Sequence, residues 1–527
     1  MKYALTHANI YLDPGRFAEA LLVEDGLIRA VGTDQEIEAL APDETIDCQG
    51  HTLIPGFNDS HSHLLMVTEN GQKLQLLDSQ SIDEIIDKGR EFIQQRPGLT
   101  ALVGMGWNPA EFSQGEKRNL HRYDLDKIST EIPVMLTSAC AHTLVCNTKA
   151  LEMAGVTKDT PQIDGGLFEI DDNGPNGRFF ENARELVDHL QPTMTSEDLF
   201  QSMSETMNYA LSNGITTVQT NDIGMVRPLE DTLKIYRDLY TGDTPTIKTN
   251  HQLCFDTPQD FEKFIHSTYQ EELPSKMTWG PLKLFKDGTL GGRSALVSEA
   301  FLDSPGNTGL DVLPIAKAKG FVDMARKHGF QVYTHCIGDK AIEEMLEVYQ
   351  PHSKDDRWAL VHCQITHADT LEKMAEAGVT AIIQPIFLRV DVGPLQEALS
   401  PETQATSYAW KTMLQLGIPI AIGTDSPVED LNPFMNLYTA LKRRNPKGEF
   451  DSYFPEQQLT IEEAIDGYTL GSAYAEGKEN QKGRLKPGYQ ADMVLLDRNI
   501  FDITPEEILE TRVLKTFVDG ELLYQAD

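Results

Sequence analysis

The sequence predicts an α/β protein: a (β/α)8 TIM barrel with a long insertion after its first strand and a small sheet domain made from both chain ends. Three observations support this prediction. Short apolar segments repeatedly follow helix-like segments, one interval between them is much longer than the rest, and both chain ends contain hairpin signals. The length of 527 residues is sufficient for one large barrel with additions.

A junction that recurs along the chain indicates a parallel sheet. A helix-like segment, a glycine and a short apolar segment follow one another at Gly214, Gly329, Gly378 and Gly417. Glycine at the end of a helix adopts the left-handed conformation at low cost and lets the chain turn back into a strand. Repeated units of this kind are typical of helices that alternate with parallel strands.

Eight segments are expected to form the strands of this sheet: 53–63, 215–221, 247–255, 282–288, 330–336, 358–364, 379–385 and 418–425. Eight parallel strands with helices between them close a barrel. An open, doubly wound sheet is the alternative, because hydrophobic periodicity does not report whether a sheet closes.

The interval between the first and second strands, about 65–213, contains roughly 150 residues and is far longer than a connecting loop needs. Its pattern is mixed α/β. The insertion begins at the C-terminal end of a barrel strand, which is the face where active sites lie. We therefore expect it to cover the pocket.

Hairpin signals mark both ends of the chain. Asp25-Gly26 and Asp519-Gly520 each lie between strand-forming residues. An Asp-Gly pair in this setting favours a type I′ turn. The two hairpins are expected to belong to one small sheet domain beside the barrel.

Composition excludes several classes of partner. There are 45 Lys+Arg against 81 Asp+Glu, a net charge of −36, whereas nucleic acids and anionic membranes require clustered basic residues. No apolar run approaches the ~18–20 residues of a membrane span. The first residues, MKYALTHANIYLDPGR, lack the apolar region of a signal peptide. The six cysteines are scattered along the chain, which is not the pattern of a disulfide framework. We expect a cytoplasmic protein without nucleic-acid or membrane partners.

Six polar residues lie at or near the ends of predicted strands: His61, His63, Lys283, His335, His362 and Asp425. Side chains at these ends meet at one mouth of a barrel. Two histidines at spacing two share one face of a strand. Imidazole binds borderline divalent metals, and a carboxylate completes such a shell. The pattern predicts a metal site. Eight other histidines are interpreted as ordinary core or surface residues: His7, His51, His121, His189, His266, His328, His352 and His367.

Two lysines lie close together in the fourth strand. Alternation places Lys283, Phe285 and Asp287 on one face and Lys286 on the other. Leu282 and Leu284 suit the face packed against helices, so Lys283 is expected to point into the barrel. Lys286 is expected to be an ordinary solvated ammonium group.

Several segments resemble a known family: PGFNDSHSH (55–63), LKLFKDGTLGGRSA (282–295), THCIGDKA (334–341), VHCQ (361–364), GTDSPVEDLNP (423–433) and GRLKPGYQADMVLLD (483–497). In order and spacing they resemble the amidohydrolase superfamily, and within it amidohydrolase family 3, the branch that contains N-substituted formamide deformylases. The resemblance extends over nearly the whole chain, including GWN (106–108) and AHTLVCNTKAL (141–151) in the insertion.

This resemblance implies a fold and a metal centre. It implies a β-sandwich from residues 1–54 and 480–527 and a hydrolase barrel over 55–479, with the insertion as a subdomain. His61 and His63 would bind one metal, and His335 and His362 the other. Asp425 would bind the first metal and transfer protons, while carboxylated Lys283 would bridge two divalent ions, with zinc the expected metal. The family often has Asp-Gly before the histidine of its insertion motif, where this chain has Cys140-Ala141 before His142.

The expected activity is hydrolysis of a non-peptide C–N bond, in an amide, N-acyl or N-formyl compound, by metal-bound hydroxide with Asp425 as proton shuttle. His142 and Arg293 are candidate donors to the tetrahedral anion, with packing and a salt bridge as their alternative roles. Trp107 is a candidate pocket residue or a packing residue. The sequence does not identify the small-molecule substrate, and a homodimer is compatible with it.

Two other functions stay open. A deaminase of a heterocycle would use the same barrel, but such enzymes typically have a glutamate near the fifth- or sixth-strand histidine, where this chain has Asp339 and Asp369. A catalytically inactive regulatory protein on this fold is the second alternative. Relatives of that kind usually lack metal ligands, whereas all six positions are present here.

Overall fold

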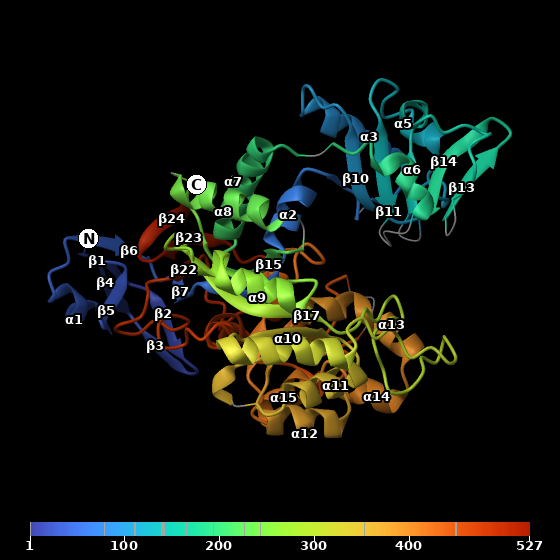
Figure 1. Cartoon of the computed structure of the whole chain (residues 1–527). Helices are drawn as coiled ribbons and strands as arrows, with labels where there is room; N and C mark the ends of the chain where they lie inside the picture. Colours follow the sequence, from blue (N-terminus) through green and yellow to red (C-terminus); the bar gives the residue numbers. More distant parts are fainter. Residues whose placement is uncertain are drawn as a thin grey trace. The chain divides into compact units, whose positions relative to one another are not determined.

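The computed structural model describes residues 2–77, 79–109, 112–138, 143–163, 166–192, 194–225, 227–242, 244–352, 354–447 and 451–526. The chain forms two compact units, one made of Met1–Val67 with Met203–Asp527 and the other of Thr68–Ser202. The larger unit contains the barrel and the strands of both chain ends (Figure 1).

The barrel is an eight-stranded parallel sheet whose strands follow one another in chain order: β8 (Phe57–Ser62), β15 (Ile215–Ile223), β16 (Lys248–Leu253), β17 (Met277–Phe285), β18 (Val332–Cys336), β19 (Ala359–His362), β20 (Thr380–Ile383) and β21 (Ile420–Ile422). A doubly wound sheet reverses its strand order at a switch point, and this sheet does not. The Asp425 N–H, in the loop after β21, donates to the His61 carbonyl at 2.8 Å. The two ends of the sheet therefore meet, and the predicted barrel is confirmed.

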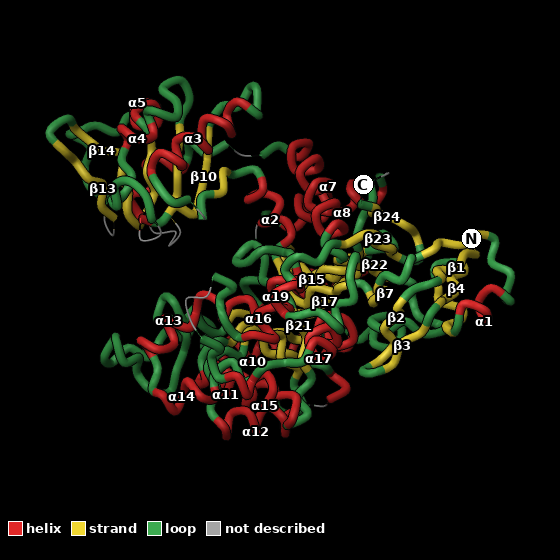
Figure 2. The backbone as a smooth tube through the Cα atoms, turned by 180° about the vertical axis from the view of Figure 1, so that it is seen from behind, coloured by secondary structure: helices red, strands yellow, loops and turns green. Residues whose placement is uncertain are grey.

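Helices surround this sheet (Figure 2). They are α2 (Leu64–Gly71), α7 (Ser196–Ser212), α8 (Leu229–Thr241), α9 (Pro258–His266), α10 (Ile315–His328), α11 (Asp339–Tyr349), α12 (Ala368–Ala377), α13 (Leu388–Ala398), α14 (Pro401–Thr406), α15 (Trp410–Gln415), α16 (Pro433–Lys442), α17 (Ile461–Asp466) and α18 (Ser472–Ala475). The predicted glycine junctions are confirmed, since Gly329 and Gly378 end α10 and α12 with φ of 72° and 69°. A left-handed φ of this kind favours glycine.

The first predicted strand is divided into two. Within 53–63, β7 (Thr52–Pro55) pairs with strands of the chain ends, and only β8 enters the barrel. The division falls at Gly56, where an added Cβ would lie 2.3 Å from the Thr216 side chain. The segment 53–63 was expected to form one strand, so the change of sheet at this glycine was not predicted.

The two chain ends form two further sheets. The first has the order β5 (Leu27–Gly32), β4 (Ala20–Glu24), β1 (Lys2–Thr6), β6 (Glu44–Asp47), and the second β24 (Glu521–Gln525), β23 (Val513–Val518), β22 (Met493–Leu496), β7, β2 (Asn9–Asp13), β3 (Arg16–Ala18). Residues of both, such as Leu21 and Phe517, share one buried cluster. The short helices α1 (Asp34–Glu38) and α19 (Pro505–Ile508) belong to the same ends of the chain.

Both predicted hairpins are confirmed. Asp25 and Gly26 have φ of 51° and 79°, and Asp519 and Gly520 have φ of 50° and 73°, as a type I′ turn requires. The two turns also meet, because an added Cβ on Gly26 would lie 2.9 Å from the Asp519 carbonyl oxygen. Opposite ends of the chain thus contribute to one domain.

The insertion is a mixed α/β unit, as its pattern predicts. Its sheet has the order β13 (Gly166–Asp171), β14 (Gly174–Glu181), β12 (Thr143–Cys146), β11 (Val134–Ser138), β10 (Leu102–Trp107), β9 (Leu74–Gln75). Its helices are α3 (Ile82–Gln94), α4 (Arg122–Leu125), α5 (Thr148–Ala154) and α6 (Glu185–Asp188). Among the described residues, no helix combines the length and hydropathy needed to span a membrane.

Candidate metal centre

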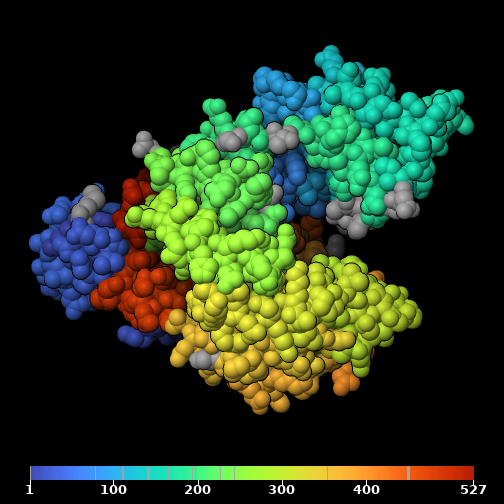
Figure 3. All heavy atoms as spheres, in the orientation of Figure 1, coloured from blue at the N-terminus to red at the C-terminus, as the bar shows by residue number. Residues whose placement is uncertain are grey.

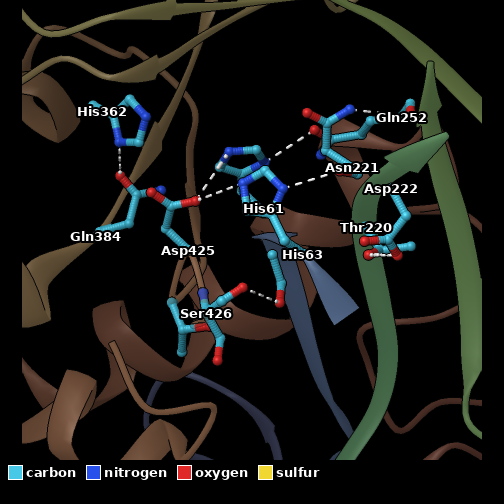
Figure 4. A network of polar contacts seen from close by, with 12 residues as sticks. His61, His63, Thr220, Asn221, Asp222, Gln252, His362, Gln384, Asp425 and Ser426 are labelled. Atoms are coloured by element: carbon cyan, nitrogen blue, oxygen red, sulfur yellow. Dashed lines mark hydrogen bonds and ion pairs between the residues drawn. The ribbon is translucent and has the colours of Figure 1, made fainter. Parts of the chain in front are cut away.

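Three predicted ligands meet at the mouth of the barrel. The Asp425 Oδ1 atom lies 3.3 Å from His61 Nε2 and 3.2 Å from His63 Nε2, and the three side chains converge in Figure 4. All three residues are buried, and one ligand atom from each lies within 4.8 Å of the other two. Two imidazoles and a carboxylate at this spacing form a donor set for a divalent ion.

Backbone contacts hold the two contributing segments together. The Asp425 N–H donates to the His61 carbonyl, and the His63 N–H donates to the Ser426 carbonyl at 2.7 Å. Asp425 has a φ of 56°, a left-handed conformation that is uncommon for a residue other than glycine. Strain at one residue persists where the surroundings determine it, and it is concentrated at functional sites.

Asp59 is a buried carboxylate behind this pair of segments. It accepts hydrogen bonds from the His61 N–H at 3.1 Å and from the Thr424 hydroxyl at 2.6 Å. Burial raises the pKa of Asp59 to about 7. Gly423 allows this close approach, since an added Cβ there would lie 2.6 Å from the His61 nitrogen.

Each strand-end histidine has its Nδ1 atom held by an oxygen. The pairs are His61 with Gln252 Oε1 at 3.0 Å, His63 with the Asn221 carbonyl at 2.9 Å, His335 with Asp287 Oδ1 at 3.0 Å and His362 with Gln384 Oε1 at 2.7 Å. An Nδ1 that donates to oxygen leaves Nε2 with a free lone pair, the usual arrangement of metal-binding histidines. Four imidazoles are therefore prepared as ligands.

The orientation of Gln252 is set by its own neighbours. Its amide nitrogen donates to the carbonyls of Ser60 and Gln219 at 3.2 and 3.3 Å. Since those carbonyls only accept, the amide oxygen must face His61. The tautomer of His61 thus depends on three barrel strands.

His335 and His362 form the other side of the mouth. Their ring centroids are 4.5 Å apart, and His362 lies 5.9 Å from His61. Two partly exposed phenyl rings flank them: Phe285 is 5.8 Å from the His335 ring, and Phe387 stacks on His362 at 6.0 Å. These rings give the mouth an apolar wall next to the imidazoles.

Lys283 is fully buried on β17, as the alternation predicts. Its Nζ atom has no hydrogen-bond partner among the described residues and lies 4.1 Å above the Phe285 ring. Burial lowers the pKa of Lys283 to about 8. Burial and then the Lys283 charge also hold the pKa of His61 well below its ordinary value. An unpartnered buried amine is costly unless another group satisfies it.

The neighbours of Asp425 determine its charge. Burial alone would raise the pKa of Asp425, but His61, His63 and His362 together hold it well below the ordinary value. Asp425 is therefore ionised at neutral pH. Its Oδ1 atom has no hydrogen-bond partner among the described residues. Such an ionised carboxylate is suited to bind a cation and to accept a proton.

Lys286 corrects one prediction. It does face away from the barrel interior, but it is fully buried rather than solvated. Its Nζ lies 2.6 Å from both Asp311 and Glu344 and donates to the Leu313 carbonyl at 3.0 Å. These partners come from distant segments, so the local pattern of the strand could not reveal them.

Two of the three expected substrate-binding residues are described, and each makes contacts within its own part of the chain. Trp107 is 1% exposed in the core of the insertion, where its indole N–H donates to the Leu136 carbonyl. Arg293 forms an ion pair with Asp303 at 2.6 Å. These contacts match the alternative roles of packing and salt bridge. His142 lies outside the described residues.

The residues that support the ligands were missed by sequence reasoning. Asp59, Gln252, Asp287 and Gln384 all lie at or just beyond barrel strands, so the rule that selects strand ends would have included them. Gln252 and Gln384 lack the residue types of a metal shell, and the sequence does not separate a ligand carboxylate from a supporting one such as Asp59 or Asp287. Only the fold shows which group each of the four contacts.

The donor set fits a divalent cation, since it combines four anchored imidazoles, an ionised carboxylate and an unsatisfied buried amine on one barrel. Together the fold and this site define a metal-binding barrel of the hydrolase type. Residues 44–524 match the model of the amidohydrolase family, and the chain belongs to that family.

Two relatives match along almost the whole chain. The putative amidohydrolase YtcJ of Bacillus subtilis (strain 168) is 30% identical over 98% of this chain and 97% of its own. The N-substituted formamide deformylase of Arthrobacter pascens is 26% identical over 96% of this chain and 95% of its own. A crystal structure of an uncharacterized metal-dependent hydrolase from Pyrococcus horikoshii OT3 superimposes with a TM-score of 0.78 at 25% identity, covering 96% of this chain and 99% of that one.

Proposed function

We propose that this amidohydrolase cleaves a non-peptide C–N bond in a small amide, N-acyl or N-formyl compound. It would use two divalent metal ions for this reaction, and zinc is the metal we propose. The observation on which the proposal depends is the set of four histidines whose Nδ1 atoms are all bonded, around the ionised Asp425. The N-substituted formamide deformylase among the relatives supports this bond type, and the metal-dependent hydrolase among the structures supports the metal.

The proposed ligands divide into two sets. His61, His63 and Asp425 would hold one ion, and His335 with His362 the other. A divalent ion held there supplies an activated water near pKa ~7 and polarises the substrate carbonyl. Asp287 and the other Nδ1 partners keep the rings oriented so that no reorganisation is needed when the ion binds.

Lys283 would link the two sets as a carbamate. Its neutral amine nitrogen would form a bond to the carbon of CO₂ and release one proton to solvent, which gives an anionic group. The complete burial of Lys283 and its lack of any partner among the described residues support this role. A carbamate would remove the cost of an unsatisfied amine and offset the charge of two cations.

Asp425 would perform the proton transfer. It would accept a proton from the nucleophilic water and donate it to the nitrogen of the leaving amine, so that the C–N bond breaks without forming an amide anion. Phe285 and Phe387 would exclude water from the carbonyl and contact the apolar part of the substrate. We also propose domain limits of 1–54 with 480–527 for the small sheet domain and 55–479 for the hydrolase barrel with its insertion.

A deaminase has less support. Asp339, the acid that follows the His335 strand, accepts from the Ser298 N–H at 3.1 Å and lies 3.3 Å from His367 Nε2. These contacts give it a structural role at the start of α11. An inactive regulatory protein is disfavoured because each of the six expected ligand positions has a residue that can bind a metal.

The test combines metal analysis with a substrate screen. Protein purified without chelators should contain about two equivalents of zinc, and it should hydrolyse a member of a panel of formamides, N-acyl amino acids, lactams and cyclic ureides. Chelation should abolish turnover and zinc should restore it. Activity in metal-free protein, or release of ammonia from aminated heterocycles instead, would overturn the proposal.

A further inference from the structure

A second group of metal-ligating side chains lies on the outside of the barrel. Glu262 and His266 are four residues apart on α9, which places them on the same helix face. His328 is the last residue of the neighbouring helix α10. One ligand atom from each of the three lies within 4.8 Å of the other two, and the two imidazole centroids are 5.5 Å apart.

One donor atom in this group is unsatisfied. The Nε2 atom of His328 is shielded from solvent and has no hydrogen-bond partner among the described residues. His266 is exposed and its ring makes no hydrogen bond within the described part of the chain. The outer surface of α9 and α10 faces solvent in the yellow-green to yellow region of Figure 3. The exposed His266 is therefore the ligand at which an ion can enter the group from solvent.

The position of the group favours positive charge. His266 and His328 end their helices, and a helix C-terminus has a partial negative charge that attracts cations. The chain goes from α10 through Gly329 directly into β18, so this helix end lies where barrel strands begin. That is the face opposite the mouth, where residues serve stability rather than catalysis.

We propose that Glu262, His266 and His328 bind a divalent cation of the zinc type that fastens α9 to α10. Two imidazoles and one carboxylate are a zinc donor set, with water as the fourth ligand. Lys327 competes for the site, because its Nζ lies 3.1 Å from Glu262 Oε1. Both side chains are exposed, so the ion pair is weak and the lysine can swing away.

The alternative is that both histidines only complement the helix ends. In that case the protein binds no zinc here, and changing either histidine alters stability equally with and without metal. The two interpretations therefore differ in zinc stoichiometry, which does not depend on turnover.

The experiment measures bound zinc per chain after equilibration at low-micromolar free zinc, for wild type, His328→Ala and His266→Ala. Each variant should bind one zinc fewer than wild type and keep the zinc at the barrel mouth. Zinc should raise the melting temperature of wild type more than that of either variant. Because His266 is exposed, its variant keeps the test decisive if His328→Ala folds poorly.

Two further variants sharpen the result. His352→Ala is the matched control, since His352 is also half-buried with an unpartnered Nε2 but belongs to no group of three candidate ligands among the described residues. It should bind as much zinc as wild type. Lys327→Gln should bind zinc several-fold more tightly, because it removes a competing cation. Equal stoichiometry in wild type and both ligand variants, or an equal loss in His352→Ala, would overturn the proposal.

Discussion

The Asp425 N–H donates a 2.8 Å hydrogen bond to the His61 carbonyl, while the Asp425 carboxylate lies 3.3 Å from the His61 imidazole. The same two residues thus close the barrel sheet and form part of the candidate metal centre. Barrel closure and ligand geometry are coupled, because the loop after β21 cannot shift without moving the carboxylate from His61 and His63. A substitution of the Asp425 side chain keeps the backbone hydrogen bond, so it can separate the role of the carboxylate from that of the backbone.

Asp425→Asn should therefore lower kcat while leaving the fold intact. The backbone N–H is kept, but an amide neither accepts the proton nor carries the negative charge. Loss of a positioned acid–base group costs ~10²–10⁴-fold in rate. Steady-state kinetics on any substrate found by the screen would measure this, with circular dichroism as the check on folding. A variant that retains wild-type kcat would refute the role as proton shuttle.

Lys283→Ala should remove activity and bound metal, with partial rescue by a small carboxylate such as acetate. The variant removes a fully buried amine that has no partner among the described residues, so the fold should tolerate it. Acetate would restore an anion at the position of the proposed carbamate. Metal analysis and activity with and without acetate test this directly.

Lys286→Met is the control on the same strand. It leaves Asp311 and Glu344 without their buried partner, so we expect a loss of about 2 kcal/mol in unfolding free energy, less than for a fully enclosed pair. Metal content should be unchanged. Metal loss in Lys286→Met rather than in Lys283→Ala would show that the bridge is assigned to the wrong lysine.

Much of the fold follows from local pattern. The eight strands and the two Asp-Gly hairpins are readable because glycine junctions and type I′ turns depend on neighbouring residues only. The division at Gly56 is not readable, because it arises from contact with Thr216, roughly 160 residues further along the chain. Register along β17 was also predictable, since alternation alone separates Lys283 from Lys286.

The convergence of the candidate ligands was predictable from the sequence, whereas the contacts that support them were not. Strand-end position selects His61, His335 and Asp425, because barrel topology brings such ends together. Which oxygen holds each Nδ1 depends on side-chain packing between strands, and no spacing rule reports that. The same holds for His266 and His328, which come together only because α9 and α10 pack side by side (Figure 1).

Gln384→Met should weaken metal binding while leaving the four histidines present. Gln384 bonds the Nδ1 atom of His362 at 2.7 Å, and its amide nitrogen has no partner in the described part of the chain. Methionine has a similar volume, so the substitution removes this one hydrogen bond and preserves the packing. Loss of such an oriented partner typically costs ~10–100-fold in metal affinity, which competition with a chromophoric chelator would measure.

Gln457→Met provides the comparison for this variant. Gln457 is buried as well, but it bonds the backbone and side chain of Thr412. Within the described part of the chain, it makes no hydrogen bond to a candidate ligand. It should lower stability without changing metal affinity. An equal affinity loss in both variants would mean that Gln384 acts through general packing and not through His362.

Asp391→Asn should stabilise the protein above about pH 6 and have little effect near pH 4. Burial raises the pKa of Asp391 to about 6, with opposing contributions from the Tyr408 hydroxyl and the Arg293 charge. The folded state thus holds a proton that the unfolded state loses near its ordinary pKa of about 4. Wild type loses stability as pH rises through this window, by about 2–3 kcal/mol for a shift of this size. Asparagine stays neutral and still accepts from Tyr408, so it avoids that cost. Urea unfolding of both proteins at about pH 5 and pH 7.5 gives the comparison. A stability difference that does not grow with pH would show that Asp391 is ionised throughout this range in the folded protein.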